Sequence, residues 1–182
     1  YGQQELAASS FVSDADTSAL FGDCRSAKQL AREGLPLTEN NILLTNAAFA
    51  LAMCGEERQA LKITDELDAG FPTDPVLHEL RLPTVRAAVE LQRGRPDQAL
   101  ELLQSTRQSQ GTYLDFAPLV YGLALLQKGR NAEAATEFQS IHEHPGWFEA
   151  TPLIPLSHLW EARALTGDKA RSRQAYERFF AL

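Results

Sequence analysis

The histidines are the residues of this 182-residue chain that are best suited to bind a metal ion. His142 and His144 flank Glu143, just before Pro145 and Gly146. A zinc site needs further ligands one helical turn away or a pair of cysteines, and neither follows in the sequence. We therefore predict solvated histidines in a loop at a helix end, where a positive charge suits the helix dipole, and no metal site.

Two cysteines, Cys24 and Cys54, lie far apart in the sequence at no spacing typical of a metal site. Two cysteines in a chain of this length do not form the dense framework of a small disulfide-rich domain. We predict that both are small buried apolar residues. This interpretation leaves the cellular compartment open, an oxidising one included.

Carboxylates form two clusters, one of Asp65, Glu66 and Asp68 and one of Glu56 and Glu57. A catalytic carboxylate pair requires burial or a charged partner that separates the two pKa values. Both clusters are expected at turns or on the outward side of a helix, so we predict that they are solvated. We therefore expect no catalytic residue and no cofactor in this chain, which is not predicted to be an enzyme.

A repeat indicates the elements that would position any site. Five glycines recur at intervals of 33 to 39 residues, each followed five positions later by a small residue. The glycines are Gly22, Gly55, Gly94, Gly129 and Gly167, and the small residues are Ala27, Ala60, Ala99, Ala134 and Ser172. A period of this length indicates stacked supersecondary units. Because apolar residues follow a helical spacing on both sides of each glycine, each unit is predicted to be a helix hairpin with glycine at a left-handed cap.

Small residues also occur seven positions before four of the glycines. They are Ala15, Ala48, Ala87 and Gly122, and Trp160 stands at the fifth position. Small side chains are therefore expected to meet across each hairpin, so that its two helices pack closely. Larger side chains are expected to fill the space between units; they are Leu67, Leu103, Phe138, Ile141, Tyr176 and Phe179.

The segments from Gly129 to Phe138 and from Gly167 to Tyr176, with Pro72 closing the second unit, resemble the tetratricopeptide repeat (TPR). This resemblance implies an all-α fold, a right-handed α-α superhelix (TPR solenoid) of about five helix hairpins. Residues 1–182 are then a single domain, with units at about 4–36, 39–72, 75–108, 113–144 and 152–182. The sequence departs from the repeat pattern at Arg86 and Glu90.

A narrower resemblance rests on residues 82–88 and on the stretch from His144 to Phe179. Both are similar to the divergent TPR tails of bacterial, acidobacterial-type Ser/Thr protein kinases and of related membrane-linked regulators. The resemblance implies a regulatory or sensory tail of such a kinase, and the alternative is the tail of a winged-helix transcriptional regulator. The sequence contains no kinase motif. The sequence begins at Tyr1, without a methionine, and ends at Leu182 inside a predicted helix. We therefore expect it to be part of a longer protein.

Charge and hydropathy narrow the class of partner. The formal net charge is −7, from 17 Lys and Arg against 24 Asp and Glu, and no basic cluster is long enough to follow a nucleic acid. No apolar run reaches the roughly 18 to 20 residues that span a bilayer. We expect a protein or peptide partner, no nucleic acid and no membrane span in this segment. The kinase-tail resemblance implies a membrane-tethered, extracytoplasmic domain; without it, the expected location is the cytoplasm.

The predicted helix at residues 116–126 is apolar on nearly every side, so it must be covered or offered to a partner. In a TPR array the first helix of each unit lines an inner groove. The candidate groove residues are Ile42, Thr45, Phe49, Met53, Arg81, Thr84, Leu91, Phe116, Leu119, Leu123, Leu126 and Ile154. One interpretation is a groove for an extended or helical segment of another chain. The other is that superhelical curvature or a linker already covers these residues.

Two further surfaces are candidates for binding. Trp147 and Phe148 lie in the longest predicted connection and are candidate loop anchors for a partner. The alternative is that both rings pack against the adjoining helices and hold the loop in place. The rival to peptide binding is an assembly role, in which the C-terminal edge pairs with a second copy to form a homodimer. The sequence leaves these alternatives open.

Overall fold

The computed structural model describes residues 2–108, 116–144 and 152–181, and this part of the chain is all-α with no strand. Its α-helices are α1 (Gly2–Leu20), α2 (Cys24–Gly34), α3 (Asn41–Met53), α4 (Glu57–Gly70), α5 (Leu82–Gln92), α6 (Pro96–Leu102), α7 (Ala117–Gln127), α8 (Asn131–Glu143), α9 (Leu153–Ala164) and α10 (Lys169–Phe180). Short helical turns are η1 (Leu35–Leu37), η2 (Leu77–Arg81) and η3 (Ser105–Gln108). The predicted all-α class is confirmed.

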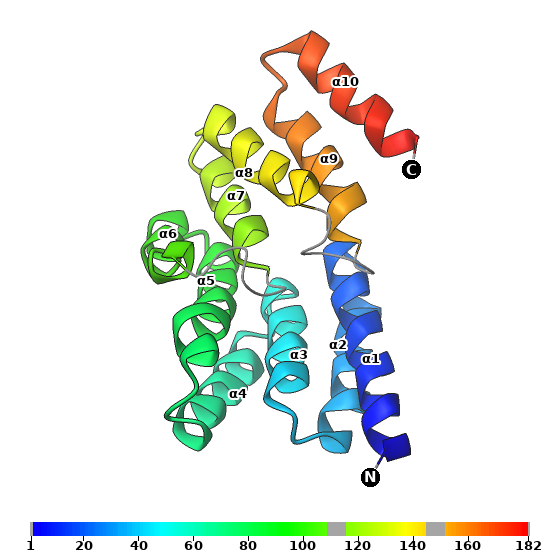
Figure 1. Cartoon of the computed structure of the whole chain (residues 1–182), viewed down its shortest axis with the longest axis vertical. Helices are drawn as coiled ribbons and strands as arrows, with labels where there is room; N and C mark the ends of the chain where they lie inside the picture. Colours follow the sequence, from blue (N-terminus) through cyan, green and yellow to red (C-terminus); the bar gives the residue numbers. More distant parts are fainter. Residues whose placement is uncertain (1, 109–115, 145–151, 182) are drawn as a thin grey trace.

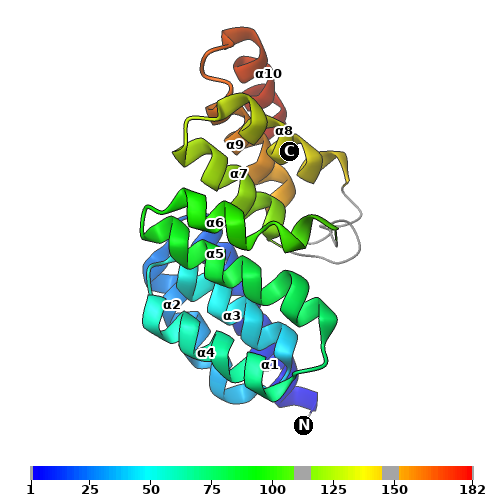
Figure 2. The same cartoon turned by 90° about the vertical axis from the view of Figure 1, so that its left-hand side faces the viewer.

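The helices follow one another as packed pairs in a repeat-like array. Each odd-numbered helix packs against the even-numbered helix that follows it. The odd-numbered helices also contact one another in order, α1 with α3, α3 with α5, α5 with α7 and α7 with α9. Figures 1 and 2 show α1 to α4 together at the end that holds the N-terminus, with α7 to α10 at the other end of the long axis. The odd-numbered helices therefore form a continuous inner layer.

Four of the five repeat glycines adopt the predicted left-handed conformation. Their φ angles lie between 70° and 80°, at Gly22, Gly55, Gly94 and Gly129. At Gly129 the amide donates to the Leu126 carbonyl and the Arg130 amide donates to the Leu125 carbonyl, both at 2.9 Å. This pattern satisfies the last carbonyls of α7 and requires a residue without Cβ. Gly167 lies outside the left-handed region, so the prediction is wrong for the last turn.

The close approach of paired helices is also present. The alanines that follow the first four glycines, Ala27, Ala60, Ala99 and Ala134, have no exposed surface. A Cβ added at Gly122 in α7 would lie only 2.5 Å from Cε1 of Phe138 in α8. Small residues at these positions therefore allow the helices of a pair to approach closely. In the last hairpin Trp160 is buried instead, with its ring centroid 5.9 Å from that of Phe138.

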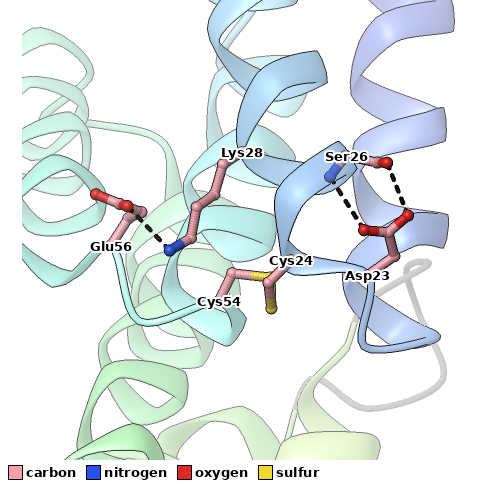
Figure 3. The surroundings of a disulfide bond; sticks show 6 residues. All are labelled: Asp23, Cys24, Ser26, Lys28, Cys54 and Glu56. Atoms are coloured by element: carbon pink, nitrogen blue, oxygen red, sulfur yellow. Dashed lines mark hydrogen bonds and ion pairs between the residues drawn. A yellow bond between two sulfur atoms is a disulfide. The ribbon is translucent and has the colours of Figure 1, made fainter.

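A disulfide joins the first two helix pairs. Cys24 begins α2 and Cys54 follows α3, and their Cα atoms lie 5.2 Å apart (Figure 3). The prediction of two independent apolar cysteines is therefore wrong. Spacing along the chain does not report that the turn after α1 and the turn after α3 lie side by side. Beside the disulfide, Lys28 of α2 forms an ion pair with Glu56 at 3.0 Å.

Ion pairs occupy the corresponding places at the next two junctions. Cys54 directly precedes Gly55, and Arg93 directly precedes Gly94. Arg93 pairs with Glu57, two residues beyond Gly55, just as Cys54 bonds to Cys24, two residues beyond Gly22. Lys128, which precedes Gly129, pairs with Asp97, which lies three residues beyond Gly94. The residue before the turn glycine thus links each pair to the one before it at three junctions.

Candidate functional site

A cavity of about 330 Å³ opens on the inner layer of odd-numbered helices. Its lining comes from α1, α3, the segment around η2 and α5, Phe116 before α7, and the start of α9. Six predicted groove residues lie in this lining: Ile42, Thr45, Phe49, Arg81, Thr84 and Phe116. Segments far apart in the sequence therefore meet at one concave site, which we call the inner groove.

The other predicted groove residues lie elsewhere. Leu91 and Leu119 are buried in the core, where neighbouring helices cover them, so neither is available to a partner. Met53, Leu123, Leu126 and Ile154 are partly buried and pack against the core outside the cavity lining. Trp147 and Phe148 lie outside the described residues. For the predicted groove residues, helical periodicity identified the helix but did not show where the array curves.

The apolar floor of the inner groove is built from stacked rings. The rings of Phe49 and Phe116 lie parallel, with centroids 4.0 Å apart, an arrangement that stabilises contacts between aromatic residues. Phe49 is buried, whereas Ile42, two turns earlier in α3, is 45% exposed. The groove therefore presents apolar surface to solvent above a packed aromatic base.

The two threonines of the lining use their hydroxyl groups within their own helices. Thr45 donates to the Asn41 carbonyl at 2.5 Å, and Thr84 donates to the Leu80 carbonyl at 2.7 Å. A hydroxyl proton held in this way is not offered to a ligand. Polar recognition in the inner groove therefore falls chiefly to other side chains of the lining.

Asp16 of α1 is a buried carboxyl group in this lining. Its Oδ1 has no hydrogen-bond partner among the described residues. Burial raises the pKa of Asp16 well above its usual value, while a hydrogen bond from Asn46 acts in the opposite direction. Ionising a buried carboxyl oxygen that has no hydrogen-bond partner is costly, so a donor supplied to Oδ1 would be favourable.

Asp16 was missed by the sequence analysis, although the repeat contains a signal for it. Asp16 stands six residues before Gly22, and Phe49 stands six residues before Gly55. Equivalent positions in a repeat face the same way, so alignment on the glycines would have placed Asp16 beside the predicted groove residue Phe49. The helix spacing of the first unit is less regular, which concealed this equivalence.

The histidines differ from their prediction in one case. His144 is exposed after α8, and its Nδ1 lies 2.9 Å from the Ser140 carbonyl oxygen, as a helix-end histidine should. His142 instead lies inside α8 with its side chain only 9% exposed. The prediction of a solvated loop is wrong for His142 because α8 continues to Glu143 and α9 packs against it.

One acidic cluster is more structured than predicted. Asp68 accepts a hydrogen bond from Arg86 of α5 at 2.8 Å and also pairs with His78 at 3.0 Å. The hydrogen bond from Arg86 is the main cause that lowers the pKa of Asp68. The Asp68 side chain is 41% exposed, as predicted for a solvated carboxylate, but the sequence did not indicate its charged partners. The ion pair with Asp68 explains the departure of Arg86 from the repeat pattern.

The comparisons with known proteins identify no relative. No protein-family model matches the chain, and neither a curated protein nor a solved structure is significantly similar to it. Within the described residues, none of the helices is long and apolar enough to cross a membrane. What the inner groove does must therefore be inferred from its own geometry.

Proposed function

We propose that this chain is a protein-binding module whose inner groove holds an extended or helical segment of another protein. The observation that carries this proposal is the combination, in one cavity, of exposed apolar surface at Ile42 with a buried Asp16 oxygen, Oδ1, that has no hydrogen-bond partner among the described residues. A volume of about 300 to 1,000 Å³ is typical of a site that encloses a ligand group. Because packed helices hold the lining in place, little conformational entropy is lost when a partner binds.

The chemistry of the groove indicates which segment fits it. A lysine or arginine side chain of the partner would supply the missing hydrogen-bond donor to Asp16 Oδ1. The nearby positive charge would also lower the pKa of Asp16 and favour its ionised form. Apolar residues beside that basic residue would cover Ile42 and Phe116. The proposed ligand is therefore a peptide in which a basic residue is flanked by apolar residues.

The parent protein is proposed on the resemblance described above. In this proposal the array is a right-handed TPR superhelix of five hairpins that serves as the regulatory tail of a bacterial Ser/Thr protein kinase. A membrane-linked winged-helix regulator is the alternative parent. The Cys24–Cys54 disulfide supports a cellular location outside the cytoplasm, because disulfides persist in oxidising compartments. Kinase motifs and a membrane span encoded upstream of Tyr1 would support the kinase, whereas an upstream winged helix would favour the alternative.

Peptide selection tests the binding function directly. The chain would be used to select from a library of random 12-residue peptides displayed on phage, and the selected peptides would be synthesised and titrated by calorimetry. We expect selected sequences to share a lysine or arginine beside apolar residues. Replacement Asp16→Asn should weaken their binding by about tenfold or more, because a charge-assisted hydrogen bond is lost. Ile42→Glu should also weaken binding.

Matched controls separate binding from folding. Asp16→Asn replaces a buried carboxyl group whose Oδ1 has no hydrogen-bond partner with an uncharged side chain of the same shape, so the melting temperature at neutral pH should not fall. Phe71→Ser changes an exposed apolar residue outside the lining and should leave peptide affinity unchanged. Selected peptides that bind Asp16→Asn and Ile42→Glu as tightly as the unaltered chain would overturn the inner groove as the binding site.

The assembly role is a second candidate that one observation favours. Phe180 at the end of α10 is 80% exposed, and it lines a shallow depression together with Thr166 and other residues of this helix. A second copy of the chain would cover this ring. Analytical ultracentrifugation should then show a dimer that Phe180→Glu converts to a monomer. A monomer at all concentrations would exclude this role without affecting the groove.

A further inference from the structure

A second buried carboxyl group stands at the same repeat position as Asp16, near the other end of the array. Glu161 of α9 lies six residues before Gly167, and it is only 5% exposed. Its Oε2 lies 3.7 Å from Nε2 of His142 in α8 and 4.0 Å from Nδ1 of His158, one turn earlier in α9. One ligand atom from each residue fits within a span of 4.8 Å. Two adjacent helices therefore direct three potential metal ligands to one point.

Hydrogen bonding fixes the form of the His142 ring. The Ser157 hydroxyl donates its single proton to the Ile154 carbonyl at 2.6 Å. Since Ser157 Oγ also lies 3.1 Å from His142 Nδ1, that oxygen must accept a proton from Nδ1. In the neutral ring Nε2 then carries the lone pair, on the side of Glu161. A hydrogen bond from the opposite ring nitrogen is the usual way in which proteins orient a metal-binding histidine.

Two of the candidate ligand atoms make no hydrogen bond. His158 Nδ1 and Glu161 Oε2 are buried and have no hydrogen-bond partner among the described residues. Burial is the main cause that lowers the pKa of His142 to about 4 and the pKa of His158 below its usual value. Burial likewise raises the pKa of Glu161. Neutral imidazoles facing a carboxyl group can coordinate a cation that none of the three could bind alone.

We propose that His142 Nε2, His158 Nδ1 and Glu161 Oε2 form a binding site for a divalent transition metal ion, with Zn²⁺ as the expected occupant. Two imidazoles and a carboxylate are a ligand set that suits Zn²⁺. Ligands about 2.1 Å from a tetrahedral ion lie about 3.4 Å apart. The distances of 3.7 and 4.0 Å to Glu161 are close to this value, and the three ligand atoms, which lie within 4.8 Å of one another, would draw together around the ion. The two imidazoles now stack with centroids 4.0 Å apart, and they would turn until their lone pairs converge.

Three protein ligands leave one position of a tetrahedral ion for water or for a group of a partner. The ion would also join α8 to α9, in the hairpin junction where His142 lies opposite His158. Arg178 of α10 is a charge that opposes binding, because its positive field lowers the pKa of both histidines. The site is therefore expected to bind metal more weakly than it would without Arg178.

Cobalt and zinc titrations test the site on the complete chain, prepared without a histidine tag. Co²⁺ alone should bind with one ion per chain and give visible d–d absorption, and Zn²⁺ should displace it and raise the melting temperature. Each of His142→Gln, His158→Gln and Glu161→Gln should weaken Co²⁺ binding by about tenfold or more. Ser157→Ala should weaken it by about tenfold, because the orienting hydrogen bond is lost. Arg178→Gln should strengthen it.

The control is His144→Gln, which removes an exposed histidine two residues from His142 and should leave Co²⁺ affinity unchanged. Circular dichroism of each metal-free variant establishes whether it is folded. If a single variant does not fold, the strengthening expected for Arg178→Gln still tests the site, because that residue is no ligand. Absence of saturable binding at millimolar Co²⁺ would overturn the proposal. So would a Co²⁺ affinity in all three ligand variants equal to that of the unaltered chain, which would indicate adventitious binding elsewhere.

Discussion

Contacts inside the hairpins and contacts between them follow different rules in this molecule. Within each of the first four hairpins the contact is the same: a small residue after the turn glycine packs against the preceding helix. At the turn edge between pairs, one repeat position instead carries a cysteine, then an arginine, then a lysine. The chain keeps one kind of contact uniform and varies the other.

The difference has a steric cause. Two helix backbones that approach closely leave no room for a longer side chain, whatever the neighbouring sequence, so the interior position is restricted to small residues. The turn edge borders solvent and requires only two side chains that bond or attract each other. Cys54 meets this requirement with a covalent bond, and Arg93 and Lys128 meet it with ion pairs. The contribution of each kind of contact to stability can be measured by substitution.

The largest effect is expected at the covalent junction. The disulfide closes a loop across a sequence separation of 30 residues. Removing such a constraint from the unfolded chain costs about 3 to 4 kcal/mol of stability in the chain-entropy model. The double replacement Cys24→Ala with Cys54→Ala should therefore lower the free energy of unfolding by this amount in urea denaturation.

Reductant provides the control for this prediction. Dithiothreitol should lower the stability of the unaltered chain towards that of the double variant, and it should leave the double variant unchanged. A chain whose unfolding is insensitive to reductant would show that the covalent junction adds nothing beyond what the ion-paired junctions provide.

A smaller loss is expected inside a hairpin, from Gly122→Ala. The added methyl would lie 2.5 Å from the buried Phe138 ring, so that ring or the helix must move. Overpacking costs about 1 to 3 kcal/mol, and the better helix propensity of alanine offsets up to about 1 kcal/mol. The net effect should be a loss of about 1 to 2 kcal/mol in chemical denaturation.

Gly70→Ala is the matched replacement, since nothing lies within 4 Å of a Cβ at that glycine. It should not reproduce the loss. If Gly122→Ala were as stable as the unaltered chain, close approach of α7 and α8 would not be what restricts this position to small residues.

The smallest effect is expected at an ion-paired junction, from Arg93→Ala. The side chains of Arg93 and Glu57 are 30% and 42% exposed, and ion pairs near the surface contribute little. Glu90, the second partner of Arg93, also pairs with Arg95. The melting temperature at pH 7 should therefore fall by less than about 3 °C. The hydrogen bond from Arg93 lowers the pKa of Glu57. Stability from this pair is therefore present above the ordinary pKa of glutamate and is lost as pH falls through the lowered value. The difference between the two chains should shrink towards pH 3.

Arg173→Ala is the matched control for charge, because its pair with Glu177 lies within α10 and joins no two hairpins. It should have a smaller effect than Arg93→Ala at every pH. A difference for Arg93→Ala that stays constant between pH 7 and pH 3 would show that packing of its side chain, and not charge, stabilises the junction.

Much of the local structure could be predicted because it depends on residues close together in sequence. Gly22, Gly55, Gly94 and Gly129 each end a helix through contacts within a few residues. The alanine five positions after each glycine indicates close packing within the same hairpin. The prediction for Gly167 was wrong: this glycine is not left-handed, and the buried Trp160 stands in its hairpin where the other hairpins have a small residue. Half of the predicted groove residues line the cavity, since periodicity identifies the helix but not the curvature of the array.

The sequence by itself determined the helices, their turns and their small-residue contacts, because these follow from local sterics and apolar spacing. Only the tertiary structure decided which distant residues meet. It placed Cys24 beside Cys54, brought Asp16 of the first helix into the inner groove, and set His142 against His158 and Glu161. Such pairings depend on how successive hairpins are rotated against one another, and that rotation comes from the sum of many contacts between units, which no single stretch of sequence contains.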